Sequence, residues 1–181
     1  TGDALRGGVV MALLLGVVAA GILLIGADIM LAGAGVPKAI ATDGAAVVRV
    51  MALAYPAQFV LIAASYFLEG VSKPRRVMIV NLAMLPVNAV LAWAWSGGHL
   101  GLPAMGAVGA AAATSLVSLL GCIGMLVACW TLPDADARGI RDLSHEALRR
   151  ATDGLRRLIM FGIVPATASG LELAGFSLLI I

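Results

Sequence analysis

The sequence has little charge and few aromatic side chains. Charged residues make up 12% of its 181 residues and aromatic residues 5%, while 61% are hydrophobic and the mean hydropathy is +1.04. A soluble domain is typically about one quarter charged and about half apolar. Because a core of this length cannot bury so much apolar surface, the composition excludes an ordinary soluble domain. It predicts that the lipid bilayer is the partner of the chain.

Residues that commonly carry chemistry are also scarce. There are two cysteines, Cys122 and Cys129, seven residues apart in an apolar run, and two histidines, His99 and His145, in connections. This spacing gives neither a disulfide framework nor a zinc signature. No phosphate-binding glycine loop, nucleophile elbow or nucleic-acid module can be recognised. We therefore expect no cofactor, no metal site, no nucleic-acid partner and no enzyme chemistry.

The sequence contains several long apolar runs. Crossing a bilayer takes about 20 apolar residues, and five runs are candidates: residues 7–27, 50–68, 77–98, 104–130 and 158–181. Lipid offers no hydrogen-bond partners to a backbone, so each run is expected to be a helix. The predicted fold class is an all-α integral membrane protein, a polytopic helix bundle with about five transmembrane helices.

The basic residues predict the direction of these helices. If the first helix starts inside the cell, the inside segments are the N-terminus, the 69–76 connection and the 131–157 linker. All but two of the basic residues then lie inside, as cytoplasmic segments require: Arg6, Lys73, Arg75, Arg76, Arg138, Arg141, Arg149, Arg150, Arg156 and Arg157. Lys38 and Arg49 lie outside.

The linker divides the chain. Its apolar residues recur at roughly helical spacing: Leu143, Ala147, Ala151, Leu155 and Leu158. This pattern fits a helix in the inner interface, against anionic lipid; a solvated basic connector is the alternative. Because transporters are often built from two related halves, we expect 1–131 to be part of an N-terminal lobe, 132–157 a cytoplasmic inter-lobe linker and 158–181 the first helix of a C-terminal lobe.

One carboxylate interrupts the last apolar run. Glu172 has no basic residue nearer than Arg157. An ionised carboxylate at the centre of a membrane helix costs about 2.5–3.5 kcal/mol on insertion scales. Glu172 avoids this cost if it stays protonated, because desolvation raises a carboxyl pKa, or if it meets a cation in a hydrated cavity. Both make it a candidate for H⁺ or Na⁺ coupling; the alternative is a neutral glutamate that is hydrogen-bonded to a neighbouring helix.

Two asparagines lie in the third run. Asn81 and Asn88 are seven residues apart, and so on nearly the same face, and Pro86 frees the backbone carbonyl of Leu82. Amide and carbonyl oxygens suit a hard cation such as Na⁺. An interhelical hydrogen bond beside a kink is the alternative for Asn88, and the favoured one for Asn81.

Hydroxyl and amide groups also occur in the second and fourth runs. The fourth is rich in Gly and Ala, which favours close helix packing. Thr114 and Ser118, four residues apart, are candidates to face a cavity. For Tyr55 and Gln58 in the second run, packing is the favoured interpretation.

Four motifs resemble the multidrug and toxic compound extrusion (MATE) family. They are FLEGVSKPRRVM at 67–78, PVNAVLAW at 86–93, GLPAMGAVGAAAAT at 101–114 and GIVPATASGLELAGF at 162–176. The resemblance implies twelve transmembrane helices in two six-helix lobes, of which this chain supplies the third to the seventh. The chain starts without Met and ends within an apolar run, and we expect a fragment or a truncated product. The remaining helices of the parent protein would then be its partners.

The same resemblance implies a secondary active transporter in the bacterial inner membrane. Such an antiporter exports organic cations, drugs or toxic metabolites, driven by Na⁺ or H⁺. Glu172 looks like the coupling glutamate of the family's seventh helix, and Asn88 and Thr114 resemble polar positions of its N-terminal lobe. Ala92 stands where some members have an aspartate.

Other functions make different demands on the sequence. A lipid-linked sugar flippase of the same wider superfamily would be expected to have several cationic residues facing a cavity, and the spans show almost none. A membrane-embedded enzyme would need clustered histidines or acids within the spans. An inactive fragment of the transporter or of the flippase is a further alternative.

Overall fold

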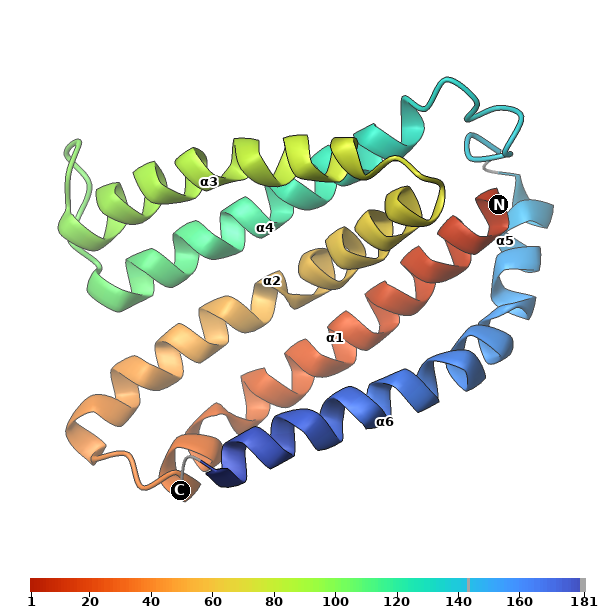
Figure 1. Cartoon of the computed structure of the whole chain (residues 1–181). Coiled ribbons are helices and arrows are strands. Elements are labelled where there is room, and N and C mark those ends of the chain that lie inside the picture. Colours follow the sequence, from red (N-terminus) through yellow and green to blue (C-terminus); the bar gives the residue numbers. More distant parts are fainter. Residues whose placement is uncertain (143, 180–181) are drawn as a thin grey trace.

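The chain folds into long helices joined by short connections and one longer linker (Figure 1). The computed structural model describes residues 1–142 and 144–179. The helices in this part of the chain are α1 (Gly2–Gly33), α2 (Lys38–Gly70), α3 (Pro74–Gly97), α4 (Gly106–Trp130), α5 (His145–Asp153) and α6 (Leu155–Leu179). The predicted all-α fold class is confirmed.

Four of these helices, α1 to α4, are long and apolar enough to cross a membrane. With 32 residues, α1 is about 48 Å long at 1.5 Å per residue, so it extends beyond the roughly 30 Å hydrocarbon core. The fifth predicted span forms the 25-residue helix α6, while positions 180 and 181 lie outside the described residues. The count of five spans is therefore approximate, and the fifth stays a prediction.

Small side chains form the interior and large ones cover the outside. Ala27, Ala52 and Ala64 are fully buried, whereas Ile25 is 82% and Leu53 69% exposed. Lipid tails are as apolar as leucine, so membrane helices associate through close packing of small residues rather than through the hydrophobic effect. This distribution of side chains fits a bundle that is surrounded by lipid.

Helices α1 and α2 approach each other closely at Gly16. A Cβ atom at this position would lie 2.5 Å from the Cα atom of Pro56 and 3.1 Å from the carbonyl oxygen of Tyr55. Pro56 lies inside α2, where its ring removes a backbone donor. The two backbones therefore touch at the point where the hydrogen-bond ladder of α2 is interrupted.

Helices α3 and α4 pack in the same way. Pro74 starts α3, where a missing N–H costs nothing, and Gly98 ends it with φ 69°, a conformation that favours glycine. On α4, a Cβ atom at Gly109 would lie 2.5 Å from the carbonyl oxygen of Trp95. Glycine at this position therefore sets the separation of the two helices.

The basic segments of the chain lie together at one end of the bundle. The N-terminus, the α2–α3 connection and the linker after α4 all lie at this end in Figure 1, and we call it the basic end. The connections from α1 to α2 and from α3 to α4 lie at the opposite end. The three segments that the charge count assigns to the inside thus share one end of the bundle.

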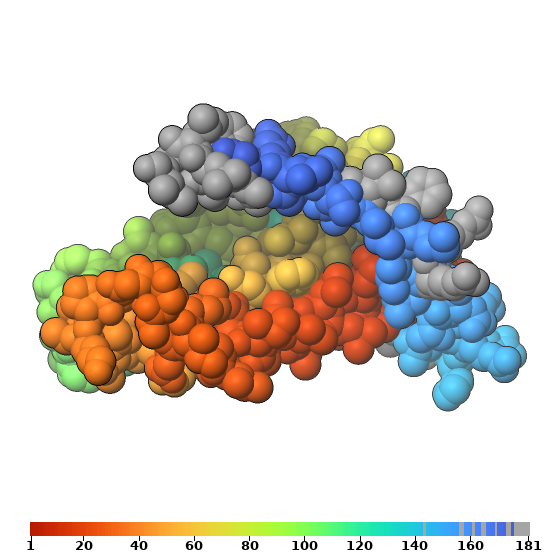
Figure 2. Space-filling view, turned by 90° about the horizontal axis from the view of Figure 1, so that it is seen from below, coloured from red at the N-terminus to blue at the C-terminus, as the bar shows by residue number. Residues whose placement is uncertain are grey.

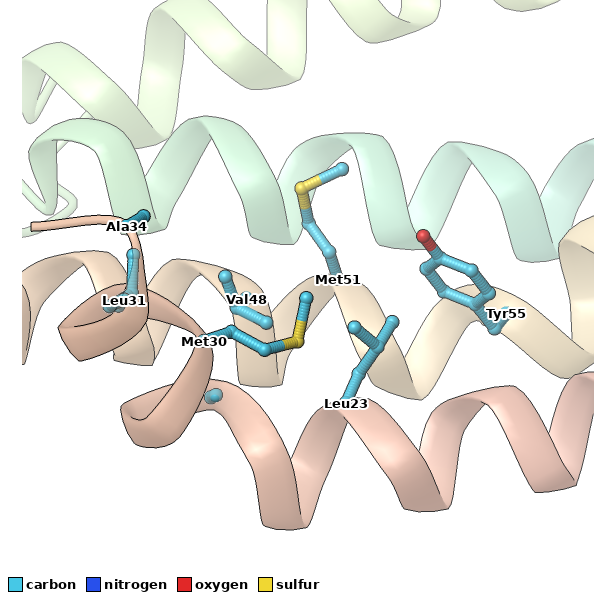
Figure 3. Close-up of a pocket in the computed structure, with 8 residues that line it drawn as sticks. Leu23, Met30, Leu31, Ala34, Val48, Met51 and Tyr55 are labelled. Atoms are coloured by element: carbon cyan, nitrogen blue, oxygen red, sulfur yellow. The ribbon is translucent and has the colours of Figure 1, made fainter. Parts of the chain in front are cut away.

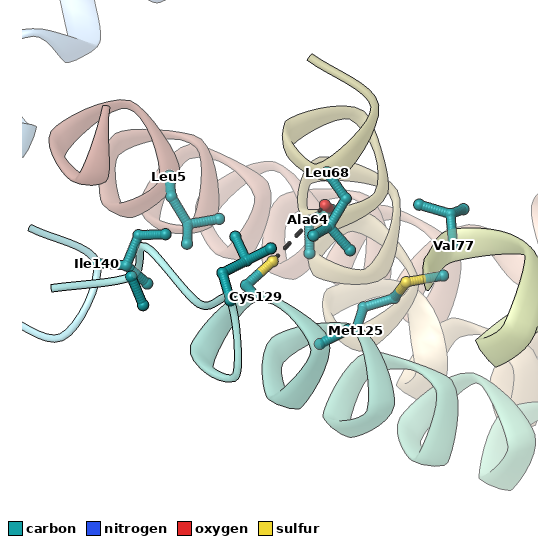
Figure 4. Packing of buried hydrophobic residues seen from close by; sticks show 10 residues of the cluster. Leu5, Ala64, Leu68, Val77, Met125, Cys129 and Ile140 are labelled. Atoms are coloured by element: carbon teal, nitrogen blue, oxygen red, sulfur yellow. Dashed lines mark hydrogen bonds between the residues drawn. The ribbon is translucent and has the colours of Figure 1, made fainter. Parts of the chain in front are cut away.

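The linker is docked on the basic end. Arg6 donates from Nη1 to the carbonyl oxygens of Gly139 at 2.7 Å and Asp142 at 2.6 Å. Leu132, Ala135 and Ile140 are buried in the cluster that Figure 4 shows, which also contains Leu5, Ala64, Leu68, Val77, Met125, Ala128 and Cys129. Residues 132–140 therefore pack as part of the bundle and do not form a solvated connector.

A short helix, α5, follows. Its N-cap Ser144 accepts a hydrogen bond from the backbone N–H of Ala147 at 3.2 Å, and Ala147 and Ala151 are buried. Hydrogen bonds from Ser144 hold the pKa of the Asp142 carboxyl below its usual range, and the charges of Arg6 and Arg150 add to this. The predicted linker helix is thus present over a shorter range, while Leu143 lies outside the described residues.

The contact at Gly16 gives a first prediction. Replacing Gly16 by alanine puts a methyl group against the backbone of Pro56, and overpacking of this kind typically costs about 1–3 kcal/mol. Gly21→Ala is the matched control, because a Cβ atom there meets nothing within 4 Å. We expect the free energy of unfolding, measured by SDS titration in mixed micelles, to fall for Gly16→Ala and to stay or rise for Gly21→Ala. Equal stability of the two variants would contradict the close contact.

The docking of the linker gives a second prediction. Arg6→Gln removes the guanidinium that holds Gly139 and Asp142, and a hydrogen bond to a charged group contributes about 1.5–3 kcal/mol. We expect trypsin to cleave the linker roughly ten times faster in this variant. Arg75→Gln changes the same charge at the same end, on an exposed residue, and should leave the cleavage rate unchanged. Protection of the linker in both variants would show that Arg6 does not hold it.

Candidate functional site

A partly polar hollow of about 240 Å³ lies between α2 and α4. Ser115 Oγ of α4 donates to the carbonyl oxygen of Val50 in α2 at 3.1 Å. Further along both helices, Cys129 Sγ contacts the carbonyl oxygen of Ala64 at 3.9 Å, which Figure 4 draws as a dashed line. Because both contacts advance in the same direction along the chain, α2 and α4 run parallel. The hollow is lined by Met51, Ala54, Tyr55, Gln58, Thr114 and Ser118. It thus brings the predicted site residue Thr114 together with two polar side chains of α2.

A second hollow of about 320 Å³ lies between α1 and α2 and is lined almost entirely by apolar side chains. Figure 3 shows its residues: Leu23, Met30, Leu31, Ala34, Val48, Met51 and Tyr55. Met51 and Tyr55 belong to both hollows, and in Figure 3 both side chains point from α2 toward α4. We call the two together the α1–α2–α4 hollow. It is apolar in one part and polar in the other.

The polar part offers oxygen atoms as acceptors. Thr114 Oγ1 donates to the carbonyl of Ala110 at 3.1 Å, and Ser118 Oγ donates to that of Thr114 at 2.9 Å. Because each hydroxyl hydrogen is used by a backbone carbonyl, the lone pairs of these oxygens remain free to accept. Sites with apolar walls and a few polar groups suit small organic ligands.

Asn88 lies in a different place, on the face of α3 that packs against α4. Met84, one turn earlier, lies 3.8 Å from where a Cβ atom of Gly121 would be. Asn88 Oδ1 is buried and has no hydrogen-bond partner among the described residues, and Asn88 does not line the α1–α2–α4 hollow. Asn81 is exposed. The two asparagines thus differ in their surroundings although they share nearly one face.

Glu172 is on α6, and its side chain is exposed. Within the described part of the chain, α6 contacts only α1 and α5. Figure 2 shows that α6 is joined to the rest at the basic end and lies apart from α1 beyond it. The structure therefore does not bring Glu172 to Asn88 or Thr114, and the coupling role of all three residues stays a prediction.

Two features of this region were not predicted. The packing interpretation of Tyr55 and Gln58 missed the hollow that they line, although a polar amide in a membrane span is itself a signal of function. Asp28, which the sequence places near the outer end of its helix, forms an ion pair with Arg49 at 2.5 Å that joins α1 to α2. Charges of opposite sign on consecutive spans could have indicated this pair.

The first 94 residues identify the family. The MatE family model matches residues 1–94 of the 181, which is more than half of the chain. The chain belongs to the MatE family. No curated protein and no solved structure matches it. This MatE chain is a multi-pass membrane protein of a transporter family rather than an enzyme. Asn88, Tyr55 and Gln58 fall within the matched range, and Thr114 and Glu172 lie beyond it.

The unpartnered oxygen of Asn88 gives a third prediction. A buried polar atom without a partner costs about 1–3 kcal/mol, and Leu has nearly the same shape as Asn. In the SDS-unfolded state the amide reaches water, so we expect Asn88→Leu to raise the free energy of unfolding by roughly 1 kcal/mol or more. Asn81→Leu, at an exposed position, should change it little. A loss of stability in Asn88→Leu would show that the amide oxygen has a partner in the protein.

Proposed function

We propose that this MatE chain acts in an antiporter that exports organic cations, drugs or toxic metabolites across the bacterial inner membrane in exchange for Na⁺ or H⁺. The family match over residues 1–94 is the observation that carries the proposal. In this proposal, residues 1–131 belong to the N-terminal lobe, residues 132–157 form the cytoplasmic inter-lobe linker, and residues 158–181 begin the C-terminal lobe.

The α1–α2–α4 hollow supports the substrate class. Its larger part is apolar and includes the flexible side chains of Met30 and Met51, which adapt to ligands of different shape. Tyr55 lies where the two parts meet, and the face of a tyrosine ring attracts a cation. An amphipathic organic cation matches this combination of apolar wall, aromatic ring and oxygen acceptors.

The position of Glu172 supports its role in coupling. It lies on α6 with its side chain exposed. In this proposal α6 crosses the membrane, where an ionised carboxylate facing lipid costs about 2.5–3.5 kcal/mol. An H⁺ or Na⁺ that binds Glu172 then removes this cost. A proton or Na⁺ that binds one conformation of the transporter more tightly than the other shifts the equilibrium between the two.

Efflux measurements test this function and give a fourth prediction. The protein is expressed from its complete reading frame in cells without their own exporters, and efflux of a fluorescent organic cation is followed with Na⁺ present or absent and the proton gradient intact or collapsed. We expect wild type to export, and Glu172→Gln, which cannot change its charge, to lose at least about tenfold in rate, a change of about 1.4 kcal/mol in the barrier.

Glu69→Gln is the matched control, since Glu69 is an exposed glutamate at the basic end and its amide variant should export normally at equal membrane abundance. Equal efflux by wild type and Glu172→Gln would place coupling elsewhere. No export of any tested cation by wild type would contradict the exporter itself and favour the sugar flippase.

A further inference from the structure

The hydroxyl groups that α4 contributes to the α1–α2–α4 hollow can accept hydrogen bonds from a ligand but cannot donate them. Thr114 and Ser118 lie four residues apart, and so on the same face of α4, and both line the polar part of the hollow. Thr114 donates its hydroxyl hydrogen to the carbonyl of Ala110 at 3.1 Å, and Ser118 donates its own to the carbonyl of Thr114 at 2.9 Å. Because a hydroxyl has one hydrogen, only the lone pairs of these two oxygens face a ligand.

Helix α2 adds two further oxygens to the same space. Gln58 and Tyr55 line the polar part, and the hydroxyl of Tyr55 points toward α4 in Figure 3. Neither side chain forms a hydrogen bond with the described part of the chain. The amide of Gln58 and the hydroxyl of Tyr55 can accept as well as donate. Every polar side chain of the hollow can therefore accept a hydrogen bond from a ligand, and the two on α4 can do nothing else.

The described lining of the hollow contains no charged side chain. Asp28 and Arg49 are the charged residues that adjoin lining residues in the sequence, and they are paired with each other at 2.5 Å. A cation inside the hollow would therefore meet no carboxylate of the lining. Removing a cation from water is costly unless its donors find hydrogen-bond partners. Since the oxygens and the ring of Tyr55 alone can offset this cost, the N–H groups of the cation should decide how tightly it binds.

We propose that the α1–α2–α4 hollow selects ammonium ions that carry N–H groups over quaternary ammonium ions, with the nitrogen at Thr114 and Ser118 and the apolar body along Met30 and Met51. This inference rests on the proposed function, because it narrows the class of organic cation that is exported. A primary ammonium has three N–H donors, as in lysine, whereas a quaternary ammonium has none, although both carry the same charge.

The direction of the preference distinguishes two kinds of recognition. A compact ammonium is strongly hydrated, so moving it into an apolar hollow costs more than moving its quaternary analogue. Aromatic rings also bind quaternary ammonium groups well. Recognition by the apolar wall and the ring of Tyr55 alone would thus favour the quaternary ion. A preference for the primary ion requires the oxygens.

Binding of two matched probes tests the proposal. They are a dansyl alkylamine and its N,N,N-trimethyl analogue, which carry the same positive charge at neutral pH. The protein, expressed from its complete reading frame, is purified in detergent micelles, and the rise in dansyl fluorescence gives the dissociation constant of each probe. We expect the primary amine to bind at least about tenfold more tightly, the factor that one hydrogen bond to a charged group contributes.

Thr114→Val removes one acceptor at nearly the same shape. We expect it to reduce the ratio of the two affinities at least about fivefold and to leave the affinity for the trimethyl probe unchanged. Ser115→Ala is the matched control, because Ser115 is the next residue of α4 and its hydroxyl binds the carbonyl of Val50 at 3.1 Å without lining the hollow. This variant should keep the ratio of wild type.

Tighter binding of the trimethyl probe, equal binding of both probes or binding of neither would overturn the proposal. So would an equal fall of the ratio in Thr114→Val and Ser115→Ala, which would indicate a change in helix packing. The efflux measurements separate this result from the proposed function. Export of organic cations without a preference between the probes would overturn the selectivity alone, whereas a tenfold preference in a protein that exports nothing would support the selectivity and contradict the exporter.

Discussion

Close contact between helix backbones is the constraint on which this structure depends. In lipid, the exposed leucines and isoleucines gain nothing by meeting one another, so the bundle is held where a missing side chain allows two backbones to touch. Gly16 against Pro56 and Gly109 against Trp95 are such places. Their positions fix how α1 meets α2 and how α3 meets α4.

The basic residues have two roles that one physical property explains. Their charge keeps them on one side of a membrane. They therefore lie next to the helix ends on that side, where backbone carbonyls lack partners within the helix. Arg76 donates to the carbonyl of Ala128 at 2.8 Å, and Arg6 and Arg141 bind carbonyls of the linker and of Trp130. Charges that orient the chain thus also satisfy its helix ends and dock the linker.

Hydropathy is a local property, so the sequence alone was enough to predict the all-α fold and, among the five spans expected, the four that the structure confirms. Its charges and motifs predicted the shared end of the basic segments and the family. The hollow was not predictable, because it depends on which faces of α2 and α4 meet. For the same reason Asn88 and Thr114, assigned together from the sequence, lie in different surroundings. Arg6 was counted as a topology signal, and only the fold shows that it binds Gly139 and Asp142. Glu172, assigned to the same coupling role, lies on α6, which contacts only α1 and α5 among the described residues.

The docked linker also limits how α6 can move. Arg6 fixes the chain at Asp142, and α5 is held again where the carbonyl oxygen of Ala151 lies 3.2 Å from the position of a Cβ atom on Gly7. Only Thr152, Asp153 and Gly154 separate that contact from the start of α6. Three residues span at most about 11 Å, so the first turn of α6 is held close to α1 at the basic end.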